Sequence, residues 1–393
     1  MTVQKDNPFL MSKVSLSLIF LASVFFFNFL SRLISAPFLV NIEQDFSLSH
    51  TQGGGLFLWL SIGNGMAMIL SGVIAKHLTH RYTIILSAVA VGISMILLSW
   101  AQSFRSFQLL LFLTGVSCGI YLPSGISTLT SLLPKSHWGR GVAVHEMAPN
   151  TGFIIAPAIA ALAMGSISWR YVFAGIGLAS IIMGAAFFLR GQGGTMPGQA
   201  PNFSVISSLI KRLQFWILVL LFSLAAGITF GCYSMLPLFL VQAHGFDEAL
   251  ANELVAFSRT PCLCIVLLAG LFVDKLGAKR TIIISLSVSG VSTLFLGLTH
   301  GTVLYILVFI QPLLAVCFFP AGFTAISMCF PLEIRNVAIS FIIPLAIVFG
   351  TGCVPTLLGW FADLALFPTG FVFYGFLVLL TMNSLFILSL PRY

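Results

Sequence analysis

Charged side chains are scarce in this sequence. Only 7% of the 393 residues are Asp, Glu, Lys or Arg, whereas a typical soluble domain carries roughly 25%. Hydrophobic residues make up 59% of the chain. So few charges cannot cover a surface that faces water on every side, which excludes an ordinary soluble protein. We therefore expect lipid to surround most of the chain, and the net charge of +8 to matter through its location.

Patterns for covalent chemistry and for metal binding are also missing. The seven cysteines all lie in apolar stretches, where a free thiol behaves as a small hydrophobic side chain. Cys262 and Cys264 are two residues apart on a predicted helix and face different directions, which argues against a metal site. The sequence contains no nucleophile motif, nucleotide-binding loop or pore loop, and its loops are too short for a catalytic or sensing domain. We predict no metal and no cofactor, and the sequence argues against an enzyme, a receptor or a channel.

Long apolar runs are what the chain has instead. A helix needs about 20 mostly apolar residues to cross a bilayer. The first run follows Lys5 and Lys13, exceeds the apolar core of a signal peptide and lacks a small-residue cleavage pattern, so we interpret it as a membrane span. We predict an all-α membrane protein. Its twelve predicted spans are residues 14–40, 52–75, 82–101, 107–132, 141–165, 169–189, 214–241, 249–273, 280–299, 303–329, 337–361 and 370–390.

One hydrophilic linker interrupts this series. Residues 191–213 include Gly-Gln-Gly-Gly and Pro197, and they separate an N-terminal six-helix bundle, 1–190, from a C-terminal six-helix bundle, 214–393. Landmarks of the first bundle recur in the second at a nearly constant offset, which indicates an internal duplication. Residues 72–76 match 270–274 and residues 152–157 match 350–355, each at an offset of 198, and Pro123 matches Pro320 at an offset of 197.

Lys and Arg concentrate on one side of the predicted membrane. If the N-terminus is cytoplasmic, 14 of the 18 Lys and Arg residues lie in cytoplasmic segments, and only Arg105 and Arg170 lie in outer loops. Positive residues are retained on the cytoplasmic side of membranes, so we predict that both termini are cytoplasmic. The lack of long extensions favours the inner (cytoplasmic) membrane of a bacterial cell, with the chain as a multi-pass monomer.

A signature occupies the loop between spans eight and nine. Gly270, Asp274, Gly277, Lys279 and Arg280 form the pattern Gly-x-x-x-Asp-Lys-x-Gly-x-Lys-Arg. This pattern resembles the loop signature of the major facilitator superfamily, and the resemblance covers the whole chain. It implies a major facilitator fold of twelve transmembrane helices in two pseudo-symmetric six-helix bundles, with the sugar-phosphate and organic-anion branches nearest. Other features similar to that superfamily are Arg140-Gly141, Gly115-x-x-x-Gly119-x-x-x-Pro123 and Trp169-Arg170.

The resemblance also implies roles for parts of the chain. In the family this loop latches neighbouring helices on the cytoplasmic side, and helices 1, 2, 4, 5, 7, 8, 10 and 11 line a central cavity. The N-terminal copy of the loop departs from the signature, because Lys76 replaces the acid, and Thr79 and His80 replace a glycine and a base. We therefore expect the latch role for Asp274 but not for Lys76.

Two arginines fall inside predicted spans, Arg32 in the first and Arg259 near the middle of the eighth. An arginine at the bilayer centre costs roughly 3 kcal/mol on insertion scales, so such residues are usually functional. Only one acid, Glu146, lies well inside a span. Two buried cations against one buried acid leave the cavity positive, and an uncompensated buried charge is unstable. The empty cavity is therefore predicted to bind an anion through Arg32 and Arg259.

Polar side chains at helical spacing mark further candidates for the cavity wall. Asn28 lies on the Arg32 face of span one, Asn150 lies on span five, and Tyr121 and Ser124 belong to a polar stripe on span four. Such stripes suit a water-filled cavity. We predict that these four residues shape the binding pocket, with packing as the alternative role for Tyr121 and the stripe.

Each charged or titratable candidate has an alternative, structural role. Arg32 either binds substrate or pairs across the two halves. Arg259 either binds substrate or bridges to Glu146 or to helix-end carbonyls. Glu146 suits a proton-coupling site and a gate salt bridge equally. His145 either titrates beside it or is a hydrogen-bonded neighbour.

Taken together, these features predict a secondary active transporter. We predict that it moves a small organic anion, such as a carboxylate, a polycarboxylate or an organophosphate, by alternating access with proton symport. Its partners are then the substrate, protons and the lipid bilayer, with no nucleic acid. An exporter or anion exchanger for amphiphilic, drug-like or lipid-like compounds is the alternative within transport. A membrane receptor or enzyme is the remote alternative.

Overall fold

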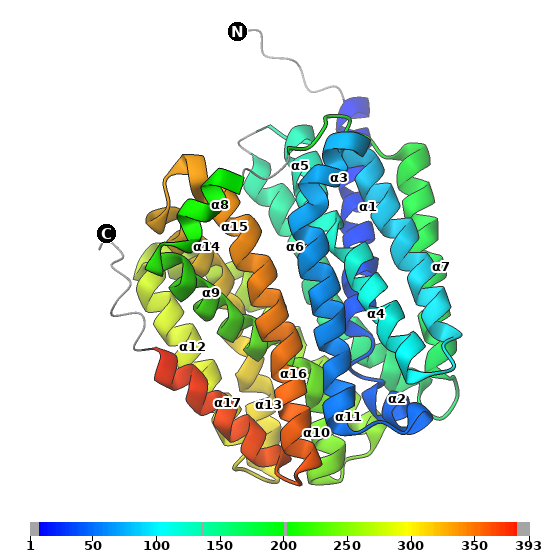
Figure 1. The fold of residues 1–393 in the computed structure, drawn as a ribbon, viewed down its shortest axis with the longest axis vertical. Coiled ribbons are helices and arrows are strands. Elements are labelled where there is room, and N and C mark those ends of the chain that lie inside the picture. The colour runs from blue at the N-terminus through cyan, green and yellow to red at the C-terminus, as the bar shows by residue number, and fades with distance from the viewer. Residues whose placement is uncertain (1–7, 135–136, 200–202, 383–393) are drawn as a thin grey trace.

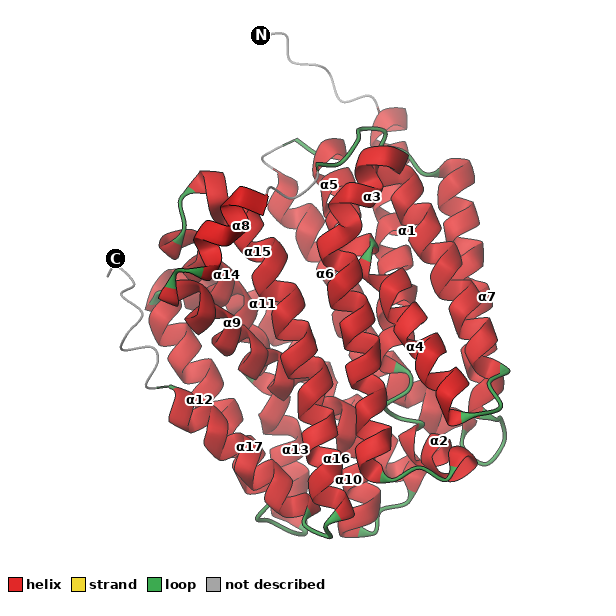
Figure 2. Ribbon diagram, viewed as in Figure 1, coloured by secondary structure: helices red, strands yellow, loops and turns green. Residues whose placement is uncertain are grey.

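The protein is helical throughout the part of the chain that the structure describes. The computed structural model describes residues 8–134, 137–199 and 203–382, and these contain helices, turns and loops but no strand (Figure 2). The helices run roughly side by side in two groups, with most of the N-terminal helices on the right of Figure 1 and most of the C-terminal helices on the left. This arrangement confirms the predicted all-α class.

The N-terminal group contains the first six predicted spans. Its helices are α1 Pro8–Leu33, α2 Leu39–Phe46, α3 His50–Ser99, α4 Phe104–Gly119, α5 Tyr121–Leu132, α6 Trp138–Ala163 and α7 Trp169–Arg190. The first span is shorter than predicted, because a turn at 34–38 that contains Pro37 separates α1 from α2. Span four is divided into α4 and α5 at Ile120, three residues before Pro123, which lacks the amide hydrogen for one backbone hydrogen bond of the helix.

The C-terminal group contains the other six spans, and three of them are interrupted. Its elements are α9 Leu213–Ala226, η2 Gly227–Gly231, α10 Cys232–His244, α11 Glu248–Leu276, α12 Ala278–Leu296, α13 Thr302–Leu313, η3 Ala315–Cys317, α14 Phe318–Cys329, α15 Leu332–Ala346, η4 Ile347–Cys353, α16 Val354–Asp363 and α17 Phe367–Thr381. The segments η2 and η4 are π-helical and lie in the middle of spans seven and eleven. Such π segments occur frequently at functional sites.

Nine helical segments of the described residues are long and apolar enough to cross a membrane. One of them, α3, is a run of 50 residues that holds predicted spans two and three. The helix α6 corresponds to span five, and α17 corresponds to span twelve, of which residues 383–390 lie outside the described part of the chain. The helices therefore match the predicted order of twelve spans.

The bend between the two legs of α3 supports the predicted duplication. Thr79 has φ 69° and ψ 160°, and Gly277, which is 198 residues later, has φ 79° and ψ 157° at the start of α12. This backbone region is essentially restricted to glycine. The first copy of the loop has thus kept the backbone conformation of the signature while losing its glycine, and the side-chain oxygen of Thr79 is buried without a hydrogen-bond partner.

The first part of the predicted linker packs against the N-terminal bundle. The amide of Arg81 donates to the Gly194 carbonyl at 2.7 Å, and the amide of Gly198 donates to the Ala75 carbonyl at 3.0 Å. The Arg81 guanidinium also donates to the Gly191 carbonyl at 2.6 Å. A short helix, α8 Phe203–Ile210, follows before α9. We call the end of the molecule that carries Thr79 and residues 191–199 the linker end; it is uppermost in Figure 1.

The two bundles touch mainly away from the linker end. The amide of His50 donates to Asp363 Oδ1 at 2.7 Å, and Asn41 donates to Glu248 at 3.1 Å. These contacts lie at the end that carries α2, lowermost in Figure 1, which we call the α2 end. Gly54 permits close approach there, because an added Cβ would lie 2.2 Å from the carbonyl oxygen of Pro355.

Candidate functional site

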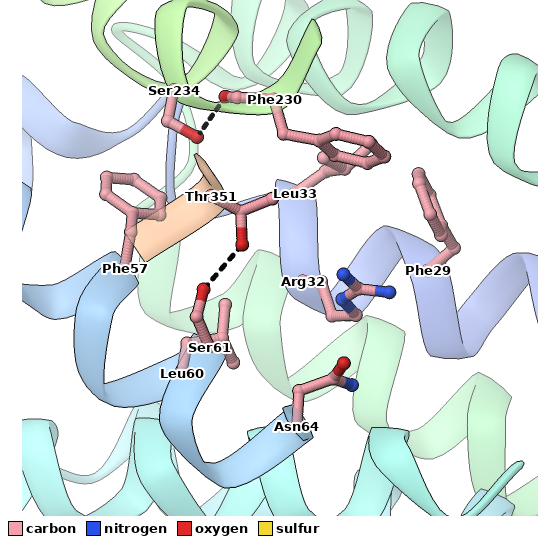
Figure 3. A pocket seen from close by; sticks show the side chains of 10 residues that line it. All are labelled: Phe29, Arg32, Leu33, Phe57, Leu60, Ser61, Asn64, Phe230, Ser234 and Thr351. Carbon is pink, nitrogen blue, oxygen red and sulfur yellow. Dashed lines mark hydrogen bonds between the residues drawn. The ribbon is translucent and has the colours of Figure 1, made fainter. Parts of the chain in front are cut away.

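A small pocket lies where the two bundles meet in the middle of the molecule (Figure 3). Its volume is about 20 Å³, which is room for roughly one water molecule. Residues of α1 and α3 line it from the N-terminal bundle, and residues of η2, α10 and η4 line it from the C-terminal bundle. The lining residues are Phe29, Arg32, Leu33, Phe57, Leu60, Ser61, Asn64, Phe230, Ser234 and Thr351.

Arg32 is the charged residue of this pocket, and its charge is not paired. Its guanidinium lies between Phe29 and Asn64 in Figure 3, with its central carbon 5.2 Å from the centre of the Phe29 ring. Among the described residues it makes no hydrogen bond and no ion pair. The neighbouring wall is closed by a hydrogen bond between the bundles, in which the Ser61 and Thr351 hydroxyls lie 2.6 Å apart.

Arg259 of α11 is the second unpaired guanidinium. It is 3% exposed. Its central guanidinium carbon lies 5.1 Å from the centre of the Phe153 ring and 4.9 Å from the centre of the Tyr233 ring. Its Nη1 donates to the Thr229 carbonyl at the long distance of 3.5 Å. Its Nε and Nη2 have no partner, and neither has the Thr229 hydroxyl.

The two free nitrogens of Arg259 form one edge of the guanidinium fork. This edge can donate two parallel hydrogen bonds to a carboxylate or phosphate, a geometry that lysine cannot supply. A buried donor without an acceptor costs about 1–3 kcal/mol, and more when it is charged. The structure therefore leaves two donors of Arg259 without an acceptor. No ion pair joins Arg259 to Glu146 in the described part of the structure, so the bridge considered from the sequence is not formed.

An aromatic cluster of Phe29, Phe153 and Phe230 connects the two arginines. The three ring centres lie 5.1 to 5.7 Å apart. Steps of 5.2 Å from Arg32 to Phe29, 5.6 Å to Phe153 and 5.1 Å to Arg259 place the two guanidinium carbons within about 16 Å of each other. The cluster contains residues of both bundles, so a relative movement of the bundles changes the space between the two charges.

Comparisons with known proteins identify the family. The family model described as Major Facilitator Superfamily matches residues 21–258 and 253–393. The chain belongs to this superfamily. It is therefore a multi-pass membrane transporter and not an enzyme.

Two curated relatives illustrate the range of similar proteins. A probable multidrug-efflux transporter of Mycobacterium tuberculosis is 24% identical over 217 residues, which are 54% of this chain and 44% of that protein, so less than half of the relative's length is matched. A probable sulfoacetate transporter of Cupriavidus necator is 24% identical over 312 residues, 72% of this chain and 69% of that protein.

Solved structures confirm the major facilitator fold. A bacterial homologue of the human lysosomal transporter Spinster, in an inward-facing and unoccupied conformation, has a TM-score of 0.80 at 16% identity and covers 96% of this chain and 97% of its own. A D-xylose–proton symporter has a TM-score of 0.76 at 18% identity and covers 96% of this chain and 98% of its own.

Arg32 lines this pocket, and the other residues predicted to bind the substrate do not. Asn28 donates from Nδ2 to the Ser87 hydroxyl at 3.2 Å, inside the N-terminal bundle. The Tyr121 hydroxyl donates to the Leu21 carbonyl at 2.7 Å, and both Tyr121 and Asn28 are buried. In this structure these side chains link α1 to α3 and α5.

Ser124 and Asn150 are also engaged elsewhere. The Ser124 hydroxyl lies 3.1 Å from Nδ1 of His80, near the bend of α3. Asn150 donates to the Glu146 carbonyl one turn earlier on α6, at 2.9 Å. Glu146 and His145, by contrast, lie together: Oε1 of Glu146 is 3.5 Å from Nδ1 of His145, and the Glu146 side chain is 44% exposed.

The superfamily loop signature has the backbone conformation expected at its central glycine. Gly277 has positive φ at the junction of α11 and α12, where a side chain would be strained. Asp274 is exposed and makes no hydrogen bond or ion pair with the described residues. Gly270 lies in open space, and Lys279 and Arg280 begin α12.

Sequence reasoning missed the aromatic and hydroxyl lining of the pocket. Phe230, Ser234 and Thr351 lie in or beside the π segments η2 and η4, and nothing in apolar periodicity distinguishes them from packing residues. The glycines offered the one available signal. Gly231 and Gly350 allow the two π segments to touch, because a Cβ on Gly231 would lie 2.7 Å from the Gly350 carbonyl oxygen.

Proposed function

We propose that the protein is a secondary active transporter that carries a small organic anion by alternating access. The observation that carries this proposal is that Arg32 and Arg259 lie at the junction of the two bundles without a carboxylate partner. Uncompensated buried charges are destabilising, and intramembrane charges in transporters usually mark the substrate path. An anion that binds between them would neutralise both.

The chemistry of the site favours a carboxylate, a polycarboxylate or an organophosphate. The free Nε and Nη2 edge of Arg259 matches two oxygens of such a group. The Thr229 hydroxyl supplies a further donor. The relative named as a probable sulfoacetate transporter supports this choice, because its named substrate is a small molecule with two acidic groups.

The direction of access is part of the proposal. The hydrogen bonds described between the bundles lie at the α2 end and in the middle, whereas Glu146, toward the linker end, is 44% exposed. The Lys and Arg distribution favours a cell inner membrane with both termini of the protein on its cytoplasmic side. In that orientation this conformation is closed toward the outside of the cell and faces the cytoplasm. The pocket then enlarges when the bundles rock, as in other transporters built from two repeats.

Proton symport completes the proposal. Glu146 is the acid that the sequence places inside a span, and its exposed carboxylate can exchange protons with water at the linker end. Proton entry there and anion binding at the arginines then belong to one transport cycle. The protein acts as a monomer in this scheme, since the pocket is formed by one chain.

A second candidate function is the export of amphiphilic compounds. The cluster of Phe29, Phe153 and Phe230 offers an apolar, stackable surface next to the pocket, and one relative is named as a probable multidrug-efflux transporter. An exporter or anion exchanger would need the aromatic surface more than it needs the two guanidiniums.

A ligand-stabilisation screen distinguishes these functions. Purified protein in detergent is heated with mono-, di- and tricarboxylates, sulfoacetate, phosphate esters, sugars and cationic drugs, because a bound ligand raises the melting temperature by mass action. Arg32→Ala and Arg259→Ala are compared with Arg105→Ala, which removes one positive charge at an exposed position. We expect an anion to stabilise the wild type and Arg105→Ala but neither Arg32→Ala nor Arg259→Ala. Stabilisation by neutral or cationic compounds alone, or equal responses in all variants, would contradict the anion transporter and favour the exporter.

A further inference from the structure

His145 is held in a defined hydrogen-bonded position between three helices. It is 1% exposed, and its ring stacks on Phe25 of α1 with the ring centres 4.2 Å apart. Its Nε2 lies 3.0 Å from the hydroxyl oxygen of Tyr121 on α5. The same hydroxyl lies 2.7 Å from the Leu21 carbonyl of α1.

These contacts determine which ring nitrogen of His145 carries hydrogen. A carbonyl oxygen only accepts, so the single hydroxyl hydrogen of Tyr121 is donated to Leu21. The Tyr121 oxygen is then the acceptor for His145, and Nε2 must carry a hydrogen. In the neutral ring Nδ1 therefore has a lone pair.

Nδ1 of His145 faces the carboxylate of Glu146. The two atoms are 3.5 Å apart, and Nδ1 is buried with no hydrogen-bond partner. Without a proton between them, a lone pair faces an acceptor oxygen, which is repulsive. One proton, on either atom, converts this contact into a hydrogen bond, and a proton on Nδ1 makes it an ion pair.

We propose that His145 and Glu146 together hold one proton, and that this proton strengthens anion binding at Arg32 through α1. The proposal rests on the proposed function for the anion site, and it assigns the coupling site to the pair rather than to Glu146 alone. The exposed carboxylate of Glu146 exchanges the proton with water at the linker end, and the buried imidazole of His145 retains it.

One face of α1 connects the proton site to the anion site. Leu21, Phe25, Phe29 and Arg32 are spaced by four, four and three residues and therefore lie on one side of the helix. Along this face the ring of His145 is 4.2 Å from Phe25, Phe25 is 6.0 Å from Phe29, and Phe29 is 5.2 Å from the Arg32 guanidinium carbon. Any movement of α6 against α1 at His145 is thus transmitted to the residues around Arg32.

The surroundings of the pair contain few other titratable groups. Tyr121 faces it from α5, and α1 contributes the Leu21 carbonyl and the Phe25 ring. Among the described residues, α7 and α11 add no hydrogen bond or ion pair to His145 or Glu146. Protonation therefore changes the local charge by one unit, and no ion pair from another described residue offsets it.

The expected strength of the link follows from the distances along α1. They place the imidazole within about 15 Å of the Arg32 guanidinium. One added positive charge at that range, in an effective dielectric constant of about 20, tightens anion binding by roughly fivefold. Linkage is reciprocal, so the anion raises the proton affinity by the same factor. A fivefold link corresponds to uptake of at most roughly 0.4 proton per bound anion.

Calorimetry measures this proton uptake. Sulfoacetate and citrate are titrated into the purified protein between pH 6 and 9, in pairs of buffers that differ in ionisation enthalpy. We expect the wild type to take up a fraction of a proton per anion, and Glu146→Gln and His145→Gln to take up none. The matched control is Glu43→Gln, which removes the acid of a second His–Glu pair, where Nδ1 of His50 lies 2.8 Å from Glu43. It should retain the wild-type uptake.

Protein whose histidines are labelled with ¹⁵N, measured without any anion, gives an independent readout of the His145 tautomer. In ¹⁵N spectra, the signals missing from His145→Gln identify His145, whose neutral ring should carry its hydrogen on Nε2. Failure of both probes to bind the wild type would count against the anion function alone, because the spectra still decide the proton site.

Three results would overturn the proposal. They are proton uptake that persists in Glu146→Gln, uptake that disappears in Glu43→Gln instead, and a neutral His145 with its hydrogen on Nδ1.

Discussion

Asp363 is expected to act as the latch of the closed α2 end. It lies at the end of α16 in the C-terminal bundle, and its carboxylate accepts the amide hydrogens of His50 at 2.7 Å and Thr51 at 2.9 Å, as well as the Thr51 hydroxyl. The carboxylate therefore caps the first turn of α3, in the other bundle, where the helix dipole favours a negative charge. Opening this end must break all of these bonds.

The magnitude follows from the hydrogen bonds. A hydrogen bond to a charged group contributes about 1.5 kcal/mol at the lower end of its range, which suits an exposed carboxylate. Because water compensates for part of the lost hydrogen bonds at this exposed position, Asp363→Ala should shift the balance between the closed and open α2 end by about 2–3 kcal/mol, or roughly 30- to 150-fold. Spin labels at the exposed residues Gln44 and Leu250, in a background whose native cysteines have been replaced, report the separation of the two bundles.

The matched control for this prediction is Asp247→Ala. Asp247 caps α11 by accepting the amide hydrogens of Ala249 and Leu250, so it makes the same kind of contact within one bundle. We expect Asp363→Ala to add a long-distance population between the labels and Asp247→Ala to add none. Identical distance distributions in Asp363→Ala and the wild type, or an equal change in the control, would refute the assignment of Asp363 as the latch.

Two further predictions concern stability. Thr79→Gly should stabilise the protein by about 1 kcal/mol. The glycine-type backbone conformation costs a threonine about 1–3 kcal/mol, and the greater flexibility of glycine in the unfolded chain offsets part of the gain from removing this strain. Thermal unfolding in detergent measures the change, and the reverse substitution at the matching position, Gly277→Thr, should lower the melting temperature. Burial raises the pKa of Glu43 above its usual range, although its hydrogen bond to His50 opposes this. An acid whose pKa is higher in the folded state contributes stability at low pH that is lost as the pH rises through that pKa. The wild type should therefore lose more melting temperature than Glu43→Gln between pH 4 and pH 7, and parallel pH curves would contradict this.

The features that the sequence predicted well are those set by solvent. Lipid imposes long apolar helices, so the twelve spans could be read from hydropathy, and a charge inside a span, as at Arg32 and Arg259, is conspicuous for the same reason. The first span was overextended because the turn at 34–38 is itself mostly apolar and resembles helix. Its Pro37 was the available warning.

The features that it predicted poorly depend on neighbours. Asn28 and Arg32 lie within the same helical face, yet Asn28 reaches Ser87 while Arg32 reaches the pocket. Spacing identifies a face but not the helix that packs against it. Likewise, His145 was recognisable as a titratable group, but its defined tautomer depends on Tyr121 and Leu21, which are distant in sequence.

The π segments also affect how this chain can be compared with other transporters. A π turn accommodates one more residue than an α turn, so η2 and η4 act as local insertions inside otherwise regular helices. If the same residues of η2 formed a regular α-helix instead, the following part of the span would rotate by roughly 100°, the turn of one residue. Ser234 would then leave the pocket, with no change in hydropathy. A relative of equal length in which this span is regularly α-helical would present different side chains to its substrate even where the aligned sequences look alike.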